Sequence, residues 1–302
     1  MMGVQHIRAN GISLAIEDHG PHNGVPLILI RGQGSQMAHW PAALIDGFAA
    51  RGFRTVIFDN RDVGLSQRCP VPGQPADADS ILDRLRRGEA LPAPYGIGDL
   101  AADVTGLMDA LAIERAHVFG ISMGGMVVQQ LMLDAPDRLL SAVIVMSACR
   151  PLGAEAGADA VAALARAEAL LVRPRTRAQY LDAQVEEHGK WGSPGYPMPE
   201  DAIRAMAEVA FDRGVDPEGM NRQVMALSGA PDRRPGLART RLPTLVLHGE
   251  DDTLIPLDLG REIAATIPGA AFRALPGMGH IITPALAPLI VAMVADFVAA
   301  LR

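Results

Sequence analysis

The chain has 302 residues, of which 49% are hydrophobic and 20% are charged. This composition supplies a large buried core and excludes global disorder. The formal net charge of −7 argues against nucleic acids and anionic membranes as main partners, because both favour a basic protein surface.

Short apolar runs alternate with helical patterns through most of the chain. The expected strands are Ile7–Ala9, Ile12–Asp18, Leu27–Arg31, Thr55–Asp59, Ala116–Gly120, Ala142–Ser147, Thr244–His248 and Ala271–Leu275. The expected helices are Trp40–Arg51, Ile97–Leu111, Met123–Ala135, Leu257–Ile267 and Ala285–Leu301. This alternation predicts an α/β fold with a mostly parallel, eight-stranded sheet and helices on both faces. The short turn at Asn10–Gly11 predicts that an antiparallel hairpin begins the sheet.

Two stretches interrupt the alternation. Residues Gln67–Tyr95 are rich in Pro and Asp and contain one small helical piece, Ser80–Arg87. The stretch from Cys149 to about Pro235 has no strand pattern, and its helical pieces are Asp159–Val172, Ala178–His188, Glu200–Arg213 and Pro217–Leu227. We therefore expect a core of residues 1–148 and 236–302 and an inserted helical cap, or lid, of residues 149–235. Ligands bind at the carboxyl ends of the strands in open α/β sheets, so the cap should close over the site.

The last apolar segment, Pro284–Arg302, is a terminal helix packed on the sheet in our interpretation rather than a membrane span. It carries Asp296 in its interior and begins with two prolines. The N-terminal residues have no basic segment followed by an apolar run, so no secretory signal is predicted. The isolated Cys69 and Cys149 match no metal-ligand spacing and predict reduced thiols in a cytoplasmic protein.

The pattern G-x-S-x-G occurs at residues 120–124, between an expected strand and an expected helix. A serine on such a sharp strand-to-helix turn needs small residues two positions before and after it. Ser122 would then project its hydroxyl over the positive end of the following helix. The pattern in this setting predicts that Ser122 is a catalytic nucleophile, whereas the plain alternative is a turn with an idle serine.

A serine nucleophile needs a base within hydrogen-bond reach and a carboxylate that orients the base. Of eight histidines, His280 alone lies in a tight loop with glycines at 277 and 279, after a strand and before the last helix. The carboxylate should follow the strand Thr244–His248, where Glu250, Asp251 and Asp252 compete. Along the chain these candidates follow the order serine, acid, histidine. The catalytic residues of one class of hydrolases with an α/β sheet follow the same order.

The oxyanion of an acyl-transfer reaction needs two preorganised N–H donors. We expect one from the backbone of Met123 and the second from the backbone of Gln33, which lies between two glycines after the third strand. The cavity between core and cap should be apolar. The candidate wall residues are Met37, Trp40, Met123, Met126, Trp191 and Met278. For each of them except Met123, a position in the core is an equal alternative.

Several motifs together resemble the α/β-hydrolase family over nearly the whole chain. Phe58–Ser66 resembles the family's D-x-R-x-x-G-x-S loop, and Leu242–Gly249 resembles its strand before the acid. Pro92–Asp103 resembles a helix start in aclacinomycin methylesterases and related bacterial carboxylesterases. The resemblance implies a triad of Ser122, Asp252 and His280, with Asp251 as the runner-up for the acid. It also implies hydrolysis of a small-molecule carboxylic ester without a cofactor or metal.

One position departs from the family, because Arg31–Gly32 stands where most members have His-Gly. The donor is a backbone group of the next residue, so the change need not abolish the oxyanion hole. Arg31 could pair with a substrate carboxylate or with Asp59 or Asp62, and we favour the pair with one of the aspartates.

Other functions remain open on the same residues. A cofactor-free haloperoxidase or perhydrolase, or a hydrolase of C–C bonds beside a ketone, would use the same triad. A more remote alternative is a non-catalytic binding protein on a hydrolase scaffold. The sequence does not determine the natural substrate, or whether the chains pair through their cap helices.

Overall fold

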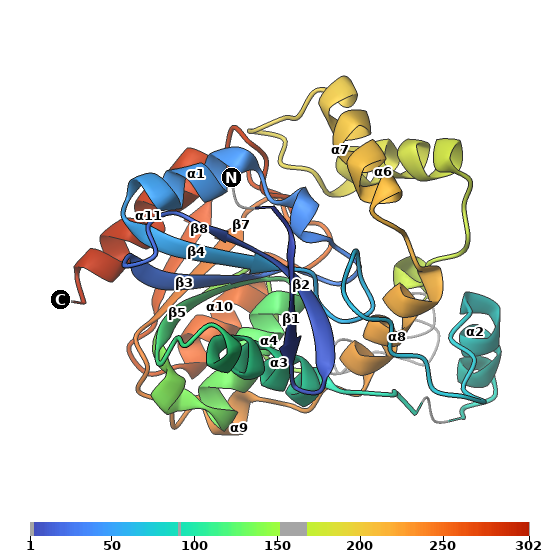
Figure 1. The fold of residues 1–302 in the computed structure, drawn as a ribbon, viewed down its shortest axis with the longest axis horizontal. Coiled ribbons are helices and arrows are strands. Elements are labelled where there is room, and N and C mark those ends of the chain that lie inside the picture. The colour runs from blue at the N-terminus through green and yellow to red at the C-terminus, as the bar shows by residue number, and fades with distance from the viewer. Residues whose placement is uncertain (1–2, 90–91, 152–167, 302) are drawn as a thin grey trace.

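The structure is a computed structural model that describes residues 3–89, 92–151 and 168–301. Its centre is an eight-stranded sheet (Figure 1). The strands are β1 (Gln5–Ala9), β2 (Ile12–His19), β3 (Val25–Ile30), β4 (Phe53–Phe58), β5 (Ala116–Ile121), β6 (Leu139–Val145), β7 (Thr244–Gly249) and β8 (Ala271–Leu275). They lie in the order β1-β2-β4-β3-β5-β6-β7-β8. Strand β2 is antiparallel to both β1 and β4, and the other pairs are parallel, which confirms the predicted fold class and the initial hairpin.

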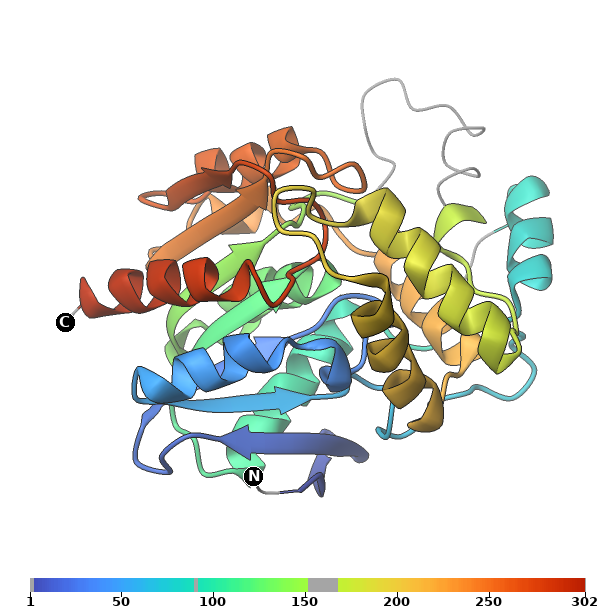
Figure 2. The ribbon, with the colours of Figure 1, turned by 90° about the horizontal axis from the view of Figure 1, so that it is seen from above.

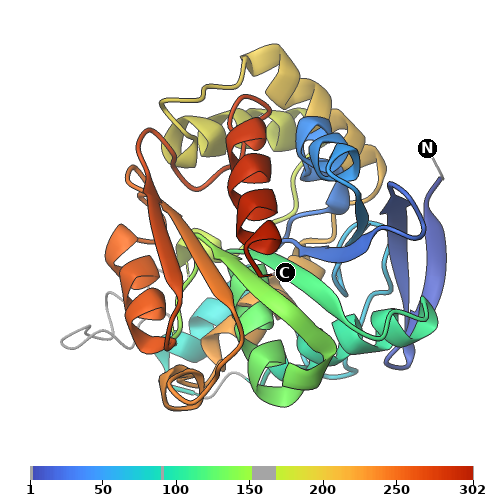
Figure 3. The ribbon, with the colours of Figure 1, turned by 90° about the vertical axis from the view of Figure 1, so that its left-hand side faces the viewer.

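Helices cover both faces of the sheet because the central strands are apolar on both sides (Figure 3). Ile28 and Ile30 of β3 face the side that is covered by α3 (Ile97–Ala110), α4 (Met123–Asp134) and α10 (Leu257–Thr266). The alternate residues of the same strand face α1 (Ala42–Ala50) and α11 (Ala287–Ala299). Smaller elements near the sheet are α2 (Ala78–Arg86), α9 (Arg234–Leu237) and the short 3-10 turns Met37–His39 and Pro136–Arg138.

The C-terminal helix α11 packs against α1 and buries Ile290, Val291 and Val294 in the core, as the sequence predicted. No helix in the described ranges has the length and apolar character that a membrane crossing would require. Cys69 and Cys149 are both free thiols.

Three helices stand over the carboxyl ends of the parallel strands, namely α6 (Arg177–Trp191), α7 (Glu200–Asp212) and α8 (Pro217–Ser228) (Figure 2). They lie in the segment that the sequence predicted as a cap. The expected helix Asp159–Val172 falls largely outside the described residues, and residues 168–170 at its end are helical. Helices α6 and α7 pack together through Tyr180, Ala207 and Ala210.

Buried ion pairs join these helices to the loop after β4. Arg213, just after α7, donates to Asp59 at 2.8 Å, and Arg222 of α8 donates to Asp62 at 2.7 Å. Gly64 has φ +54°, and a Cβ there would overlap the Asp59 carboxylate. The conformation of this loop therefore presents two buried carboxylates to the arginines of the helices above it.

Candidate active site

Ser122 is the single residue between β5 and α4, and its backbone has φ 54° and ψ −120°. Positive φ is a strained conformation for a residue with a side chain, so the surrounding structure must enforce it. A Cβ on Gly120 would overlap the backbone of Gly124, and a Cβ on Gly124 would overlap the carbonyl of Ile30. Glycine is therefore required at both positions for the strand, the turn and the helix to pack this closely.

His280 lies in the loop between β8 and α11, and its Nδ1 is 2.7 Å from Oδ2 of Asp252, which follows β7. The other oxygen of Asp252 accepts backbone N–H groups from Leu254 at 3.0 Å and Ile255 at 2.8 Å. The backbone N–H of His280 donates to the Trp191 carbonyl at 2.7 Å. With Nδ1–H donating to the carboxylate, the neutral imidazole has its free lone pair on Nε2.

Burial of Asp252 would by itself raise its pKa, but hydrogen bonds from His248 and His280 outweigh this effect and hold the pKa below the usual range. The side chain of Asp252 is fully buried, so these hydrogen bonds hold an ionised carboxylate in a dry environment. This arrangement orients the His280 ring.

The competing acids lie elsewhere. Asp251 is exposed and accepts the Gly277 backbone N–H at 2.9 Å, while Glu250 is exposed to solvent. His248 is fully buried, with its Nε2 2.8 Å from the carbonyl oxygen of Ile255. Of the three candidate carboxylates, only that of Asp252 contacts His280.

The loop after β3 passes close to Ser122. A Cβ placed on Gly32 would lie 3.1 Å from the Cβ of Ser122. Helix α8 holds this loop through two bonds: the Gln33 side chain donates to the Met220 carbonyl at 3.2 Å, and the Gly34 N–H donates to Gln223 at 2.8 Å.

The backbone N–H groups of Gln33 and Met123 make no hydrogen bond to any group in the described ranges. Met123 is the first residue of α4, where the helix itself offers no acceptor for the N–H. Two free donors are thus available near the serine.

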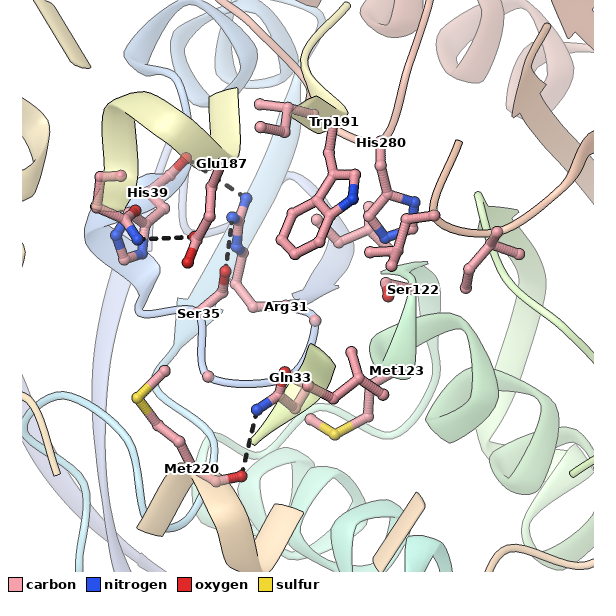
Figure 4. A pocket seen from close by; sticks show the side chains of 18 of the residues that line it. Arg31, Gln33, Ser35, His39, Ser122, Met123, Glu187, Trp191, Met220 and His280 are labelled. Atoms are coloured by element: carbon pink, nitrogen blue, oxygen red, sulfur yellow. Dashed lines mark hydrogen bonds between the residues drawn. The ribbon is translucent and has the colours of Figure 1, made fainter. Parts of the chain in front are cut away.

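Ser122 and His280 line one cavity of about 830 Å³, and Figure 4 shows the imidazole above the serine hydroxyl. The sheet edge and the helices above it share the walls. Four of the six expected wall residues line the cavity: Trp40, Met123, Met126 and Trp191.

Met37 and Met278 occupy the core, which was the alternative to the cavity wall for both. Both side chains are buried in the core beneath α1 and α11, where the backbone turns them away from the cavity. The wall residues that the sequence missed come from the segment above the sheet, among them Met198, Met206 and Met220. Only their tertiary position identifies them, because a methionine on a helix is as compatible with a core position.

The favoured ion pair of Arg31 with Asp59 or Asp62 was wrong, because Arg213 and Arg222 occupy those carboxylates. The Arg31 guanidinium lines the cavity instead and lies over the Trp40 ring, 4.5 Å from its centroid. Three or more metal-ligating side chains do not come together anywhere in residues 3–89, 92–151 and 168–301.

Comparisons with known proteins agree on the fold family of the chain. A family model for the alpha/beta hydrolase fold matches residues 25–283. Rhodomycin D methylesterase from Streptomyces peucetius is 28% identical over 297 residues, which cover 92% of each chain. The enol-lactonase from Burkholderia xenovorans LB400 superposes with a TM-score of 0.73 at 25% identity, over 98% of this chain and 100% of that one. A hydrolase from Pseudomonas aeruginosa PA01 superposes with a TM-score of 0.72 at 26% identity, over 99% and 97% of the two chains.

Proposed function

This chain belongs to the α/β-hydrolase family, and from that premise we propose that it is a serine hydrolase that cleaves carboxylic esters through an acyl-enzyme. Ser122 is the nucleophile, His280 the general base and acid, and Asp252 the orienting carboxylate. The backbone N–H groups of Gln33 and Met123 form the oxyanion hole. Residues 149–235 act as the lid of the substrate cavity.

The geometry supports a two-step reaction. Ser122 Oγ attacks the acyl carbonyl carbon while His280 Nε2 takes the hydroxyl proton. The negative charge on the carbonyl oxygen is held by the two free N–H donors, and Asp252 stabilises the imidazolium ion. The C–O bond to the alcohol then breaks as His280 returns the proton to the leaving oxygen. Water, activated by His280, hydrolyses the acyl-enzyme in the same way.

One observation carries the proposal: the strained serine and a histidine bound to a buried carboxylate face the same cavity. A structural role would not require the serine to occupy a left-handed backbone conformation at the cavity floor. The names of the two relatives, a methylesterase and an enol-lactonase, agree with an open or cyclic ester as the substrate.

The proposed chemistry uses side chains and backbone groups of the chain alone. The two free thiols suit a reducing compartment, so we place the enzyme in the cytoplasm. Its substrate would be a small molecule that the apolar cavity can enclose.

Hydrolysis of p-nitrophenyl acetate and p-nitrophenyl butyrate by the purified protein tests the proposal. We expect turnover that falls by at least about 10³-fold in Ser122→Ala, and stoichiometric labelling of Ser122 by a fluorophosphonate. Ser228→Ala, which removes a different hydroxyl from the cavity lining, serves as a matched control. Full activity of Ser122→Ala would overturn the assignment of the nucleophile.

A further inference from the structure

The cavity is lined by the Arg31 guanidinium, a cation that no acidic side chain in residues 3–89, 92–151 and 168–301 neutralises. None of the ion pairs in the described parts of the chain includes Arg31, so no described carboxylate oxygen lies within 4.0 Å of it. Its Nε atom is buried and has no hydrogen-bond partner there. Arg31 as a whole is half-buried. A charge that is largely removed from water without a counter-ion costs free energy, so its retention at the cavity calls for a functional reason.

The guanidinium is held in place without being saturated. It lies over the Trp40 ring, donates to Ser35 Oγ at 3.1 Å and donates to the carbonyl of His39 at 3.4 Å. Figure 4 shows Arg31 between Ser35 and the helix that carries Glu187. These bonds use two of its five N–H donors, which leaves three for a ligand.

The surroundings of Arg31 keep its charge and add further donors. Burial lowers its pKa to about 9, which still leaves it protonated at neutral pH. Burial and the charge of Arg31 lower the pKa of His39 to about 3, so that ring is neutral. Its Nδ1 accepts the Gln36 backbone N–H at 2.9 Å, which places the ring proton on Nε2. Nε2 of His39 and Nε1 of Trp40 are buried donors without a partner in the described residues.

Apart from His39 and His280, the other titratable side chains that line the cavity are Tyr180, His188, Glu187 and Arg175. Burial raises the pKa of Tyr180 to about 12, so that group is neutral. Burial lowers the pKa of His188 and raises the pKa of Glu187, so both are shifted towards their neutral forms. Arg175 is exposed at the cavity rim. Among these groups, Arg31 is a cation held in place by its contacts, and Glu187 is an acid whose charged form is disfavoured by burial.

We infer that Arg31 forms an anion subsite, and that the ester cleaved here carries a carboxylate group a few bonds from its scissile carbonyl. The inference rests on the proposed function, since it names the substrate class of the same cavity. Three features carry it: the unpaired guanidinium, its unused donors, and its place one residue before the loop that passes Ser122. A guanidinium fork matches the two oxygens of a carboxylate. The apolar remainder of the cavity would enclose the body of the substrate.

The test compares esters that differ in one group. Mono-p-nitrophenyl succinate, glutarate and adipate carry a terminal carboxylate, and matched esters with an isopropyl group in its place are neutral. We measure the ratio of kcat/KM for each charged ester to that for its neutral partner. We expect Arg31→Met to lower this ratio by roughly 10- to 100-fold for the best chain length, and Arg31→Lys to lower it less.

Arg175→Met is the matched control, because it removes another arginine from the same cavity. Its ratio should stay within about threefold of the unmodified protein, since an exposed charge contributes little. An unchanged ratio in Arg31→Met for all three chain lengths would overturn the inference. An equal loss in Arg175→Met would also overturn it, because the preference would then reflect general attraction of anions to the cavity.

A binding measurement separates the two proposals. Glutaric acid mono-4-nitroanilide has the same carboxylate but an amide that resists hydrolysis, and its affinity can be measured by calorimetry with Ser122→Ala. We expect the added change Arg31→Met to weaken its binding by about 10-fold or more. If no ester is hydrolysed but this difference is found, the proposed function fails and the anion subsite stands. If esters are hydrolysed through Ser122 and the two affinities are equal, only the anion subsite fails.

Discussion

The two walls of the cavity are built in different ways. The floor is the edge of the sheet, where Ser122, Asp252 and His280 each lie in a turn directly after a strand. Close backbone packing and short hydrogen bonds fix these three positions. The roof is formed by α6, α7 and α8, which are joined to the core through side-chain ion pairs. The proposed reacting groups therefore depend on the sheet, whereas the proposed choice of substrate would depend on side chains that are far apart in the sequence.

The largest expected effect tests the floor. We expect Asp252→Asn to lower kcat/KM for p-nitrophenyl butyrate by about 10⁴-fold, because an amide no longer holds the imidazole in the productive tautomer. The neighbouring Asp251→Asn is the control and should change kcat/KM by less than about threefold, since its carboxylate is exposed and bonds only to a backbone N–H. A greater loss in Asp251→Asn would mean that the wrong acid is assigned.

The next effect tests how the roof is attached. Arg222 is 4% exposed and pairs with the fully buried Asp62, so Arg222→Met leaves a buried carboxylate without its partner. We expect the free energy of unfolding to fall by about 3–5 kcal/mol in urea denaturation. The control is Arg204→Met, which breaks exposed pairs with Glu200 of α7 and Asp182 of α6 and should cost no more than about 1 kcal/mol. Equal losses would show that burial of the ion pair does not distinguish the roof contacts.

These contrasts explain what the sequence could and could not reveal. The turns at Ser122 and His280 are visible in short patterns because glycines mark them. The backbone that a Cβ would overlap is local only for Gly120, whereas Gly124 lies against Ile30 and Gly279 against Gly192. The pairing of Arg31 was predicted wrongly because Arg213 and Arg222, more than 150 residues away, occupy the two aspartates.

The residues of the cavity wall were also predicted only in part, because long-range packing determines them. The sequence identified Trp40 and Trp191 as candidates, left Met37 open between core and wall, and overlooked Met206 and Met220. A local pattern shows that a side chain is apolar. It does not show whether that side chain faces the core or the space under the roof, because long-range packing decides this.

The stability of the floor should depend on pH in a predictable direction. The folded pKa of Asp252 is lowered, so its contribution to stability is complete above the unfolded value of about 4 and is lost as the pH falls through the folded value. We expect the difference in the free energy of unfolding between the unmodified protein and Asp252→Asn to be constant from pH 6 to 8. It should shrink below about pH 4. A difference that grows on acidification would contradict the assigned direction of the pKa shift.

The smallest expected effect tests whether a side chain of the roof influences which substrates are cleaved. Glu187 of α6 is an acid that lines the same cavity as Arg31, and its ionised form would repel the carboxylate of the substrate class that we infer. We expect Glu187→Gln to raise kcat/KM for the charged esters by about two- to fivefold and to leave the neutral esters within twofold. Glu186→Gln changes the exposed neighbour on the same helix and should have no such effect. Because burial raises the pKa of Glu187, the advantage of the variant should decline as the pH is lowered and the unmodified side chain takes up its proton. A selective loss on the charged esters would instead mean that Glu187 helps to hold them, and the roof would then contribute attraction where we expect repulsion.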